Sequence, residues 1–190
     1  MTPPTALLWR AEPFESERLL IRSPRAGDGP RVHAGVVASL AALRAFPASL
    51  PWALAEPSVE TSEAFCCGAQ QAWGLGTAYP MLLLRRHDGT HVGNSGVHAV
   101  DWNVPKCEIG YWIRSDQTGH GYATEAVRAI SEWAFEHLAM RRIEARPDAE
   151  NHASCRVLER AGYALEGTMR HERATVDGRM RDTRLYACVR

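Results

Sequence analysis

The sequence predicts a mixed α/β fold in which helices cover the faces of one β-sheet. Segments with apolar residues at helical spacing alternate along the chain with short apolar segments typical of strands, and turn residues separate them. The composition is that of a globular protein, with 45% hydrophobic and 23% charged residues. The length of 190 residues is close to that of one domain, and no linker, low-complexity tract or internal repeat divides it. We therefore expect a single domain over residues 1–190, with a core over about 17–189.

The first part of the chain is expected to hold one short strand and then two helices. Leu19–Arg22 is apolar and ends before a Ser-Pro pair, as expected of a strand. A helix begins at Asp28, has Pro30 in its first turn, and places apolar residues on one stripe. A second helix, with a weaker pattern, is expected over residues 57–73.

The middle of the chain changes to patterns typical of strands. We expect strands over residues 79–86, 91–100, 106–114 and 142–146. The Asp88-Gly89 pair predicts a tight turn between the first two of them.

The remaining segments are expected to form two helices and a hairpin. A polar loop over residues 115–121 opens a strongly periodic helix that continues to about Leu138. A helix over residues 151–161 is expected to stop at Gly162, and the tail, 163–189, reads as a hairpin that turns at Asp177-Gly178. The arginine-rich hairpin is most simply a charged, exposed ladder. The whole order predicts a mixed, mostly antiparallel sheet of about seven strands, with about four helices on its faces.

Charge argues against nucleic acid as a partner. Lys plus Arg number 22 and Asp plus Glu number 22, so the formal net charge is zero. A nucleic-acid-binding protein needs a clear basic excess to neutralise phosphates.

Cysteine usage and hydropathy predict a cytoplasmic protein without metal or membrane partners. The five cysteines are odd in number and contain no C-x-x-C pair, which argues against a disulfide framework and a structural zinc site. The first 13 residues lack the charged and apolar regions of a secretory signal. The apolar stretches are too short or too interrupted to span a bilayer.

The loop that opens the helix after residue 121 has the features of a phosphate-binding site. It reads Thr118-Gly119-His120-Gly121-Tyr122-Ala123 and follows the apolar strand. Unpaired N–H groups and the positive end of the dipole make a helix start attractive to anions, and glycine lets the backbone approach a pyrophosphate. The same glycines would equally suit a turn that binds nothing. A Walker loop is excluded because no lysine follows the glycines, and a dinucleotide fingerprint would need glycine where this chain has Thr124.

Several motifs, in this order, resemble those of the GNAT N-acetyltransferases. They are Gly110-Tyr111-Trp112-Ile113, the loop with its following Thr-Glu-Ala, Asn151-His152-Ala153-Ser154, and Leu158-Glu159-Arg160-Ala161-Gly162-Tyr163. More narrowly, they resemble the branch that includes ribosomal-protein serine/alanine N-terminal acetyltransferases, from about Leu19 to Val189. The family's loop begins with Gln or Arg, and Thr118 is the one departure. The resemblance implies the acyl-CoA N-acyltransferase fold.

The resemblance also implies that acetyl-CoA is the co-substrate. No metal is expected, because the sequence has no ligand cluster with zinc spacing. The coenzyme is expected at a V-shaped opening between residues 109–113 and the strand near residues 142–146. Its pantetheine arm would pair with backbone much as an added strand does, and its pyrophosphate would rest on N–H groups of the loop. The expected coenzyme-binding residues are Trp112, Ile113, Thr118, Gly119, His120, Gly121, Tyr122, Ala123, Thr124 and Asn151.

Glu108 is the candidate general base for an amine acceptor. It is a lone carboxylate inside an otherwise apolar strand, and the resemblance supports this role. A cross-strand ion pair with Lys or Arg is the alternative. If the preceding turn closes near Trp102-Asn103, His98 falls opposite Glu108, where it would share the proton or only complete the core.

Asn151 and Ser154 are candidates for the coenzyme side of the reaction. From the residues alone, Asn151 reads as a helix N-cap and Ser154 as a solvated first-turn hydroxyl. The resemblance implies instead that Asn151 contacts the pantetheine arm and that Ser154 lies near the thioester sulfur. Other branches use a tyrosine as the thiolate acid, and this helix contains no matching tyrosine.

The resemblance points to direct acetyl transfer to a primary amine, with an N-terminal α-amine of a protein or peptide ranked first. A small amine such as a polyamine, an aminoglycoside or an aminoacyl nucleotide toxin is the second acceptor class. A non-catalytic CoA-binding regulatory module is the alternative of another kind. Trp52, Trp73 and Trp102 are expected beside the acceptor cleft, and either a monomer or a homodimer is compatible with the sequence.

Overall fold

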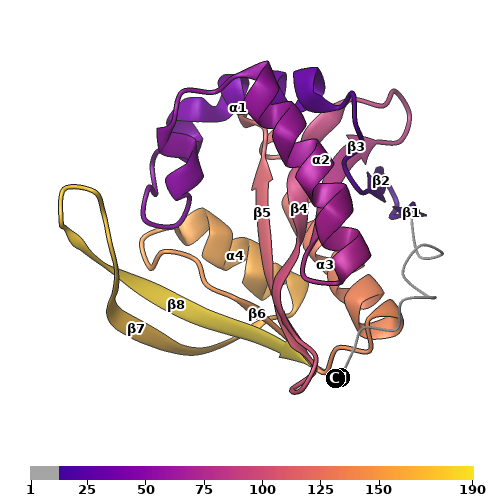
Figure 1. The fold of residues 1–190 in the computed structure, drawn as a ribbon. Helices are drawn as coiled ribbons and strands as arrows, with labels where there is room; N and C mark the ends of the chain where they lie inside the picture. Colours follow the sequence, from indigo (N-terminus) through magenta and orange to yellow (C-terminus); the bar gives the residue numbers. More distant parts are fainter. Residues whose placement is uncertain (1–12) are drawn as a thin grey trace.

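A computed structural model of the protein describes residues 13–190. One eight-stranded sheet runs through the molecule, in the order β1-β2-β3-β4-β5-β6-β8-β7 (Figure 1). Its strands are β1 (Phe14–Glu15), β2 (Leu19–Arg22), β3 (Tyr79–Arg85), β4 (His91–Asp101), β5 (Lys106–Ile113), β6 (Arg142–Ala145), β7 (Ala164–Ala174) and β8 (Met180–Val189). The helices are α1 (Gly29–Leu43), α2 (Val59–Leu75), α3 (Tyr122–His137) and α4 (His152–Ala161), with short 3-10 turns η2 (Pro51–Leu54) and η3 (Ser115–Gln117).

The predicted fold class is confirmed, and the strand count is corrected from about seven to eight. The additional strand is β1, whose two residues pair antiparallel with Leu20 and Ile21 of β2. A two-residue strand is too short to show a period in the sequence, so only the pairing partner reveals it. β5 and β6 are the one parallel pair among these strands, which makes the sheet mixed and mostly antiparallel.

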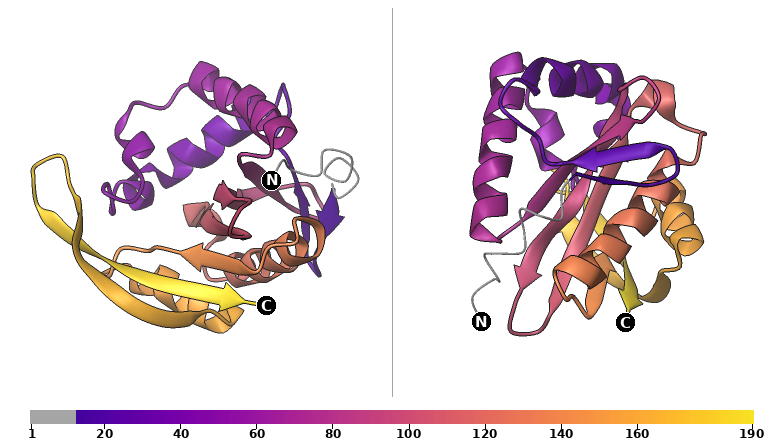
Figure 2. Two further views of the ribbon diagram at one scale, coloured as in Figure 1. Left: turned by 60° about the horizontal axis from the view of Figure 1, so that its bottom comes forward. Right: turned by 90° about the vertical axis from the view of Figure 1, so that its right-hand side faces the viewer.

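The helices form two layers, one on each face of the sheet. α1 and α2 cover one face and α3 and α4 the other, as the left view of Figure 2 shows. Side chains of β5 alternate between these layers, because successive residues of a strand point to opposite faces. Cys107 and Ile109 pack with the α3–α4 core, whereas Trp112 packs with the smaller core under α1. Glu108 and Gly110 share the face of Trp112 by the same alternation.

The sheet opens between β5 and β6. The two strands pair only from Lys106 opposite Arg142 to Glu108 opposite Glu144. Beyond Glu108, β5 continues to Ile113 with β4 as its neighbour, whereas β6 ends at Ala145 and is followed shortly by Pro147. Proline has no N–H to continue a ladder, which favours a strand end here. The expected V-shaped opening is therefore present, with one edge of β5 free of strand partners over residues 109–113.

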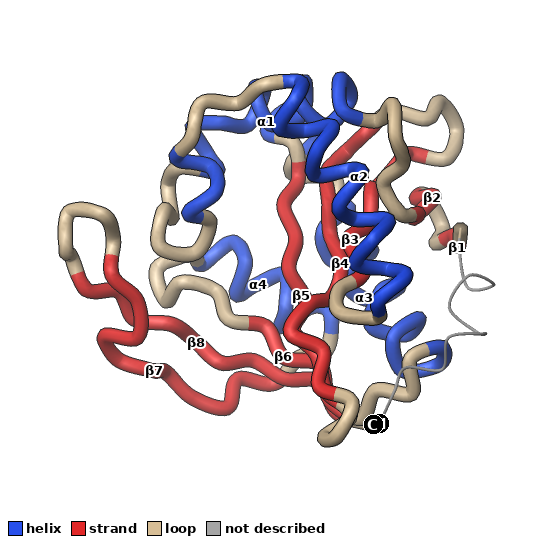
Figure 3. The backbone as a smooth tube through the Cα atoms, in the orientation of Figure 1, coloured by secondary structure: helices blue, strands red, loops and turns tan. Residues whose placement is uncertain are grey.

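The β7–β8 hairpin extends beyond the body of the molecule and turns at Asp177-Gly178 as expected (Figures 1 and 3). It is not simply an exposed charged ladder. Arg181 is buried and pairs with Asp148 through bonds of 2.6 and 2.8 Å, with 7% and 2% of the two side chains exposed. Asp148 lies between β6 and α4, so this pair anchors the segment that begins α4.

The Asp148–Arg181 pair should contribute strongly to stability. Burial would raise the pKa of Asp148, but hydrogen bonds from Arg181 and from the Glu150 N–H outweigh it, and the pKa is lowered. Asp148→Asn leaves the buried Arg181 charge with the exposed Glu150, at 2.9 Å, as its remaining carboxylate partner, so we expect the free energy of unfolding to fall by about 2 kcal/mol near neutral pH. Because the folded-state pKa is lowered, this contribution is present above the unfolded pKa of about 3.9 and is lost as the pH falls through the folded value.

Urea unfolding near neutral pH and at about pH 3 measures both effects. The difference between the natural protein and Asp148→Asn should shrink at the acidic pH. Asp177→Asn is the control, because Asp177 is exposed at the tip of the same hairpin. Equal stability of the two variants near neutral pH would contradict this role of Asp148.

Candidate active site

The predicted coenzyme loop lies between the free end of β5 and the start of α3, after the short turn η3 (Figure 3). Gly119 and Gly121 have positive φ values of 80° and 82°, which residues with a Cβ rarely adopt. The N-cap residue of α3 is Gly121, which has no side chain. The first N–H groups of the helix are therefore not bonded to a capping side chain. A Cβ at Gly119 would meet nothing within 4 Å, so space is open beside the loop. These features fit a pyrophosphate cradle.

Arg18, the residue before β2, supports the loop from outside and was not predicted from the sequence. Its guanidinium donates to the carbonyl oxygen of His120 over 2.9 Å and lies 4.9 Å from the ring centre of Tyr122. It also pairs with Glu125 of α3 at 2.6 Å. Burial would raise the pKa of Glu125, but hydrogen bonds from Ser16 and Arg18 outweigh it and lower the pKa. The loop is therefore tied to the segment between β1 and β2, about one hundred residues earlier in the chain.

The other loop residues contribute backbone more than side chain. The hydroxyl of Thr118 donates to the carbonyl of Ser115 over 3.0 Å, inside the turn. The His120 ring is exposed and lies 3.4 Å from the Gln117 carbonyl oxygen. Trp112 and Ile113 pair with β4 along one edge of β5, and their other edge faces the opening.

Glu108 lies at the closed end of the opening, opposite His98 as predicted. One carboxylate oxygen is 3.7 Å from His98 Nε2 and the other is 3.5 Å from Arg146 Nε, and 20% of the side chain is exposed. The alternative expectation of an ion pair with Lys or Arg is thus also met, by Arg146, the residue that follows β6.

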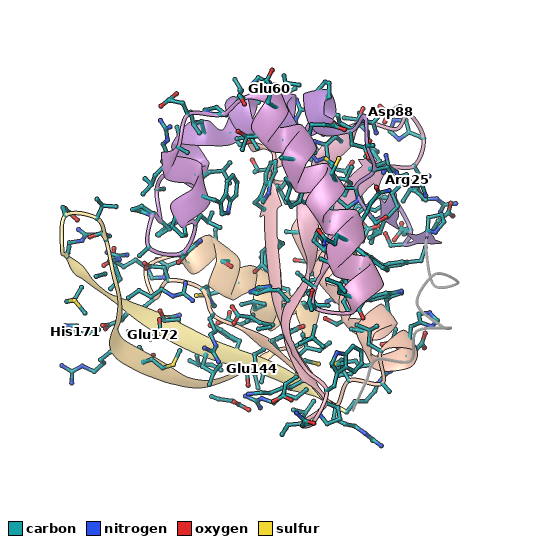
Figure 4. All side chains as sticks on the ribbon, in the orientation of Figure 1. Arg25, Glu60, Asp88, Glu144, His171 and Glu172 are labelled. Carbon is teal, nitrogen blue, oxygen red and sulfur yellow. The ribbon has the colours of Figure 1, made fainter. Side chains whose placement is uncertain are left out.

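Arg146 is a site residue that the sequence did not indicate. Its guanidinium donates to Glu144 over 2.9 Å, and Glu144 (labelled in Figure 4) also binds Arg142 over 2.7 Å. Arg146 Nε is buried and makes no hydrogen bond within residues 13–190, although it is the atom nearest Glu108. Arg146 therefore places a positive charge beside the Glu108 carboxylate, and both Glu108 oxygens remain without a close hydrogen bond from this arginine.

Asn151 and Ser154 are together at the start of α4. The side-chain oxygen of Asn151 accepts the N–H of Ser154 over 3.0 Å, so Asn151 is the helix N-cap that its sequence position suggests. The Ser154 hydroxyl lies 2.8 Å from the hydroxyl of Tyr111 on β5. Sequence reasoning looked for a tyrosine in this helix and missed Tyr111, although strand alternation from Ile109 would have placed it on the same face.

Glu108 and Ser154 therefore approach the opening from opposite faces of the sheet. Glu108 lies on the α1–α2 face, and the Tyr111–Ser154 pair lies on the face covered by α3 and α4. A molecule bound in the opening would have a carboxylate on one side and a hydroxyl on the other.

A cleft of about 550 Å³ leads from the α1–α2 face to this opening. Its apolar lining includes Val36, Leu50, Trp52, Phe65 and Trp112. At the sheet it reaches Gly110 and His98, the residue that contacts Glu108. The cleft has the size and lining of a small-molecule or peptide-side-chain site.

Two of the three tryptophans expected beside the acceptor cleft lie elsewhere. Trp52 lines the cleft as expected. Trp73 is 2% exposed and packs in the core, with its indole N–H on the Pro80 carbonyl. Trp102 donates to the Gly76 carbonyl over 3.1 Å and anchors a loop. An amphipathic side chain near a predicted connection can anchor it as readily as bind a ligand, so sequence position alone did not distinguish these roles.

Within residues 13–190, no group of three or more His, Cys, Asp or Glu is placed to hold a metal ion. No helix in that part of the chain is long and apolar enough to cross a bilayer.

Comparison with solved structures gives the same fold. RimJ of Mycobacterium smegmatis in complex with a CoA disulfide superposes with a TM-score of 0.81 and 26% identity, over 100% of this chain and 90% of that one. A ribosomal L7/L12 alpha-N-protein acetyltransferase, RimL, in complex with coenzyme A, has a TM-score of 0.82 over 92% of this chain and 95% of that one. Its identity of 24% supports the likeness of fold alone.

Curated relatives match the chain in part. The uncharacterized N-acetyltransferase p20 of Bacillus licheniformis is 31% identical over 116 residues, which cover 60% of this chain and 64% of p20. YdaF of Bacillus subtilis, provisionally named a ribosomal N-acetyltransferase, is 34% identical over 104 residues, or 55% of this chain and 56% of YdaF. The matches thus span less than two thirds of these relatives. The profile of the acetyltransferase (GNAT) domain matches residues 18–164, most of the sheet and all four helices, and the chain therefore belongs to the GNAT family.

Proposed function

We propose that this protein transfers acetyl from acetyl-CoA directly to a primary amine, and that the acceptor is the N-terminal α-amine of a protein or peptide. The observation that carries the proposal is the opening between β5 and β6, which has the Glu108 carboxylate on the cleft side and the Ser154 hydroxyl on the other. Acetyl transfer to an amine needs a proton acceptor on the amine side and stabilisation of the leaving thiolate on the coenzyme side.

The coenzyme would be held mainly by backbone. Acetyl-CoA supplies the activated acetyl thioester. Its pyrophosphate would rest on the N–H groups of residues 118–124, where two glycines leave room, and its pantetheine arm on the free edge at Trp112 and Ile113. The Asn151 oxygen already caps α4, so its amide N–H₂ is the part that remains to contact the arm.

Glu108 would accept the proton of the acceptor ammonium. It borders the cleft through His98, and the Arg146 guanidinium lies 3.5 Å from its other carboxylate oxygen. Ser154 would donate a hydrogen bond to the departing sulfur. These two roles need no covalent acetyl-enzyme, so the acetyl group passes directly between the two substrates.

Two observations support an α-amine acceptor over other amines. The chain resembles proteins whose names describe ribosomal-protein acetylation, among them YdaF. The cleft is lined mainly by apolar side chains, with Glu56 as its acidic and His98 as its basic residue. Such a lining suits the first side chain of a peptide better than a polycationic amine, because an unpaired charge is costly to bury.

Calorimetry and an acceptor panel test this function. CoA and acetyl-CoA should bind with similar affinity, because the shared pyrophosphate and pantetheine provide most contacts. Peptides with an apolar first residue should be acetylated at least about tenfold faster, in kcat/KM, than peptides with a charged first residue or than polyamines. Binding of CoA without turnover of any amine would indicate a regulatory module, and absence of binding would refute the proposal.

A further inference from the structure

The hydroxyl of Ser154 does not stand alone: it is paired with Tyr111 across the opening of the sheet. The two hydroxyl oxygens are 2.8 Å apart, and the Tyr111 hydroxyl is also placed to donate to the Ser154 carbonyl oxygen over 3.1 Å. Tyr111 belongs to the part of β5 that has no partner in β6, and its hydroxyl contacts the start of α4 instead. Ser154 is partly exposed and can still be reached by a ligand in the opening.

Tyr111 is suited to donate a hydrogen bond and poorly suited to lose its proton. Burial raises its pKa well above the ordinary value for tyrosine, an effect only partly offset by the bond to Ser154. The ionisable groups that face it are Cys155 of α4 and Tyr186 of β8, and both would make a phenolate less favourable. Tyr111 therefore remains protonated near neutral pH.

A serine hydroxyl has one hydrogen and can point it in several directions. If the Tyr111 hydrogen is donated to the Ser154 carbonyl oxygen, the Ser154 hydroxyl donates to Tyr111 and its own hydrogen is not available to a ligand. If Tyr111 donates to the Ser154 hydroxyl oxygen, the serine hydrogen is free to donate to a ligand in the opening, and the two successive hydrogen bonds strengthen each other. A negative charge arriving in the opening favours the second arrangement.

We propose that Tyr111 is a positioning residue that turns the Ser154 hydroxyl toward the sulfur of the coenzyme. This role rests on the proposed function. Glu108 takes one proton from the acceptor ammonium, and the free amine nitrogen then bonds to the acetyl carbon and loses its second proton to water. The carbon–sulfur bond breaks and its electron pair stays on sulfur. The Ser154 hydroxyl donates a hydrogen bond to that thiolate, and the Tyr111 hydroxyl donates to the Ser154 hydroxyl oxygen. Both hydroxyls keep their protons. The thiolate takes its proton from water after release.

A purely structural role for Tyr111 would be to bridge the gap between β5 and α4. The chain offers a matched control for that alternative. Tyr163 and Ser131 form a second tyrosine–serine pair, with their hydroxyls 2.7 Å apart, inside the core between α3 and α4. Both residues are more deeply buried than the Tyr111–Ser154 pair, so Tyr163→Phe removes a comparable hydrogen bond at no smaller structural cost.

The test measures the pKa of the coenzyme thiol while it is bound. The pH of a complex of CoA with the full-length protein is raised in steps, and the ultraviolet absorbance of the thiolate is followed. The same protein bound to desulfo-CoA is the blank. Hydrogen bonds to a charged group are among the stronger ones, so Ser154→Ala should raise the bound thiol pKa by about one unit and Tyr111→Phe by about half of that. The double variant should do no more than Ser154→Ala, and Tyr163→Phe should leave the thiol pKa unchanged.

Turnover gives a second readout. Replacing the thioester sulfur of acetyl-CoA by oxygen makes a poorer leaving group, so Tyr111→Phe should lower kcat by a larger factor with the oxygen ester than with acetyl-CoA. A bridging role would lower both equally. Equal thiol pKa values in Tyr111→Phe and Tyr163→Phe, with CoA bound normally, would overturn the role of Tyr111 alone. Failure of the natural protein to bind CoA would overturn the proposed function as well.

Discussion

Glu108→Gln should lower kcat by about a hundred- to ten-thousand-fold, the contribution typical of a positioned general base. The dissociation constant of acetyl-CoA should change little, because the coenzyme loop and the free edge of β5 lie beyond this residue. Glutamine keeps the shape of the side chain but cannot accept the proton of the acceptor amine. Steady-state kinetics together with calorimetry separate the two quantities.

The loss in kcat caused by Glu108→Gln should shrink as the pH rises, because a larger share of the acceptor then arrives as free amine and needs no base. Glu166→Gln is the matched control. Glu166 is also a strand glutamate paired with an arginine, Arg142, but it lies on the exposed β7 away from the cleft. If Glu108→Gln stays within a few-fold of the natural rate while CoA binding is intact, Glu108 is a structural ion-pair residue. His98 or an ordered water would then be the base.

Gly121→Val should abolish detectable coenzyme binding. The side chain would enter the loop where the pyrophosphate is expected, and a Cβ there would lie 3.5 Å from the Arg18 guanidinium that supports the loop. Valine also disfavours the left-handed backbone of Gly121, whose φ is 82°, at a cost of about 1–3 kcal/mol in stability. The loss of binding therefore has to be separated from a loss of folding.

Gly178→Val makes that separation. Gly178 has nearly the same backbone, with a φ of 80°, and a Cβ there would meet nothing within 4 Å at the hairpin turn. Both variants should unfold at similarly lowered temperatures, and only Gly121→Val should fail to bind CoA in calorimetry. Unchanged CoA affinity in Gly121→Val would show that the loop does not hold the coenzyme.

The helices and strands, and the features that depend on neighbours in the chain, could be predicted from the amino-acid sequence. Helical and strand periods predicted the four helices and all strands but β1, because each period reports which side of a segment meets the core. The glycine loop and the Asn151 cap were predictable for the same reason: backbone geometry and capping are set within a few residues. The opposition of His98 and Glu108 also followed from one short turn.

Contacts between segments far apart in the chain were decided by the tertiary structure alone. Arg146 reaches Glu108 because β6 is a parallel neighbour of β5, a pairing formed through α3. Tyr111 meets Ser154 because those strands part after Glu108, and Arg181 is buried because its partner Asp148 begins the path to α4. A charged or hydroxyl side chain has the same appearance in the sequence whether it is solvated or paired. Its surroundings depend on which distant strand or helix packs beside it, and local periodicity carries no record of that packing.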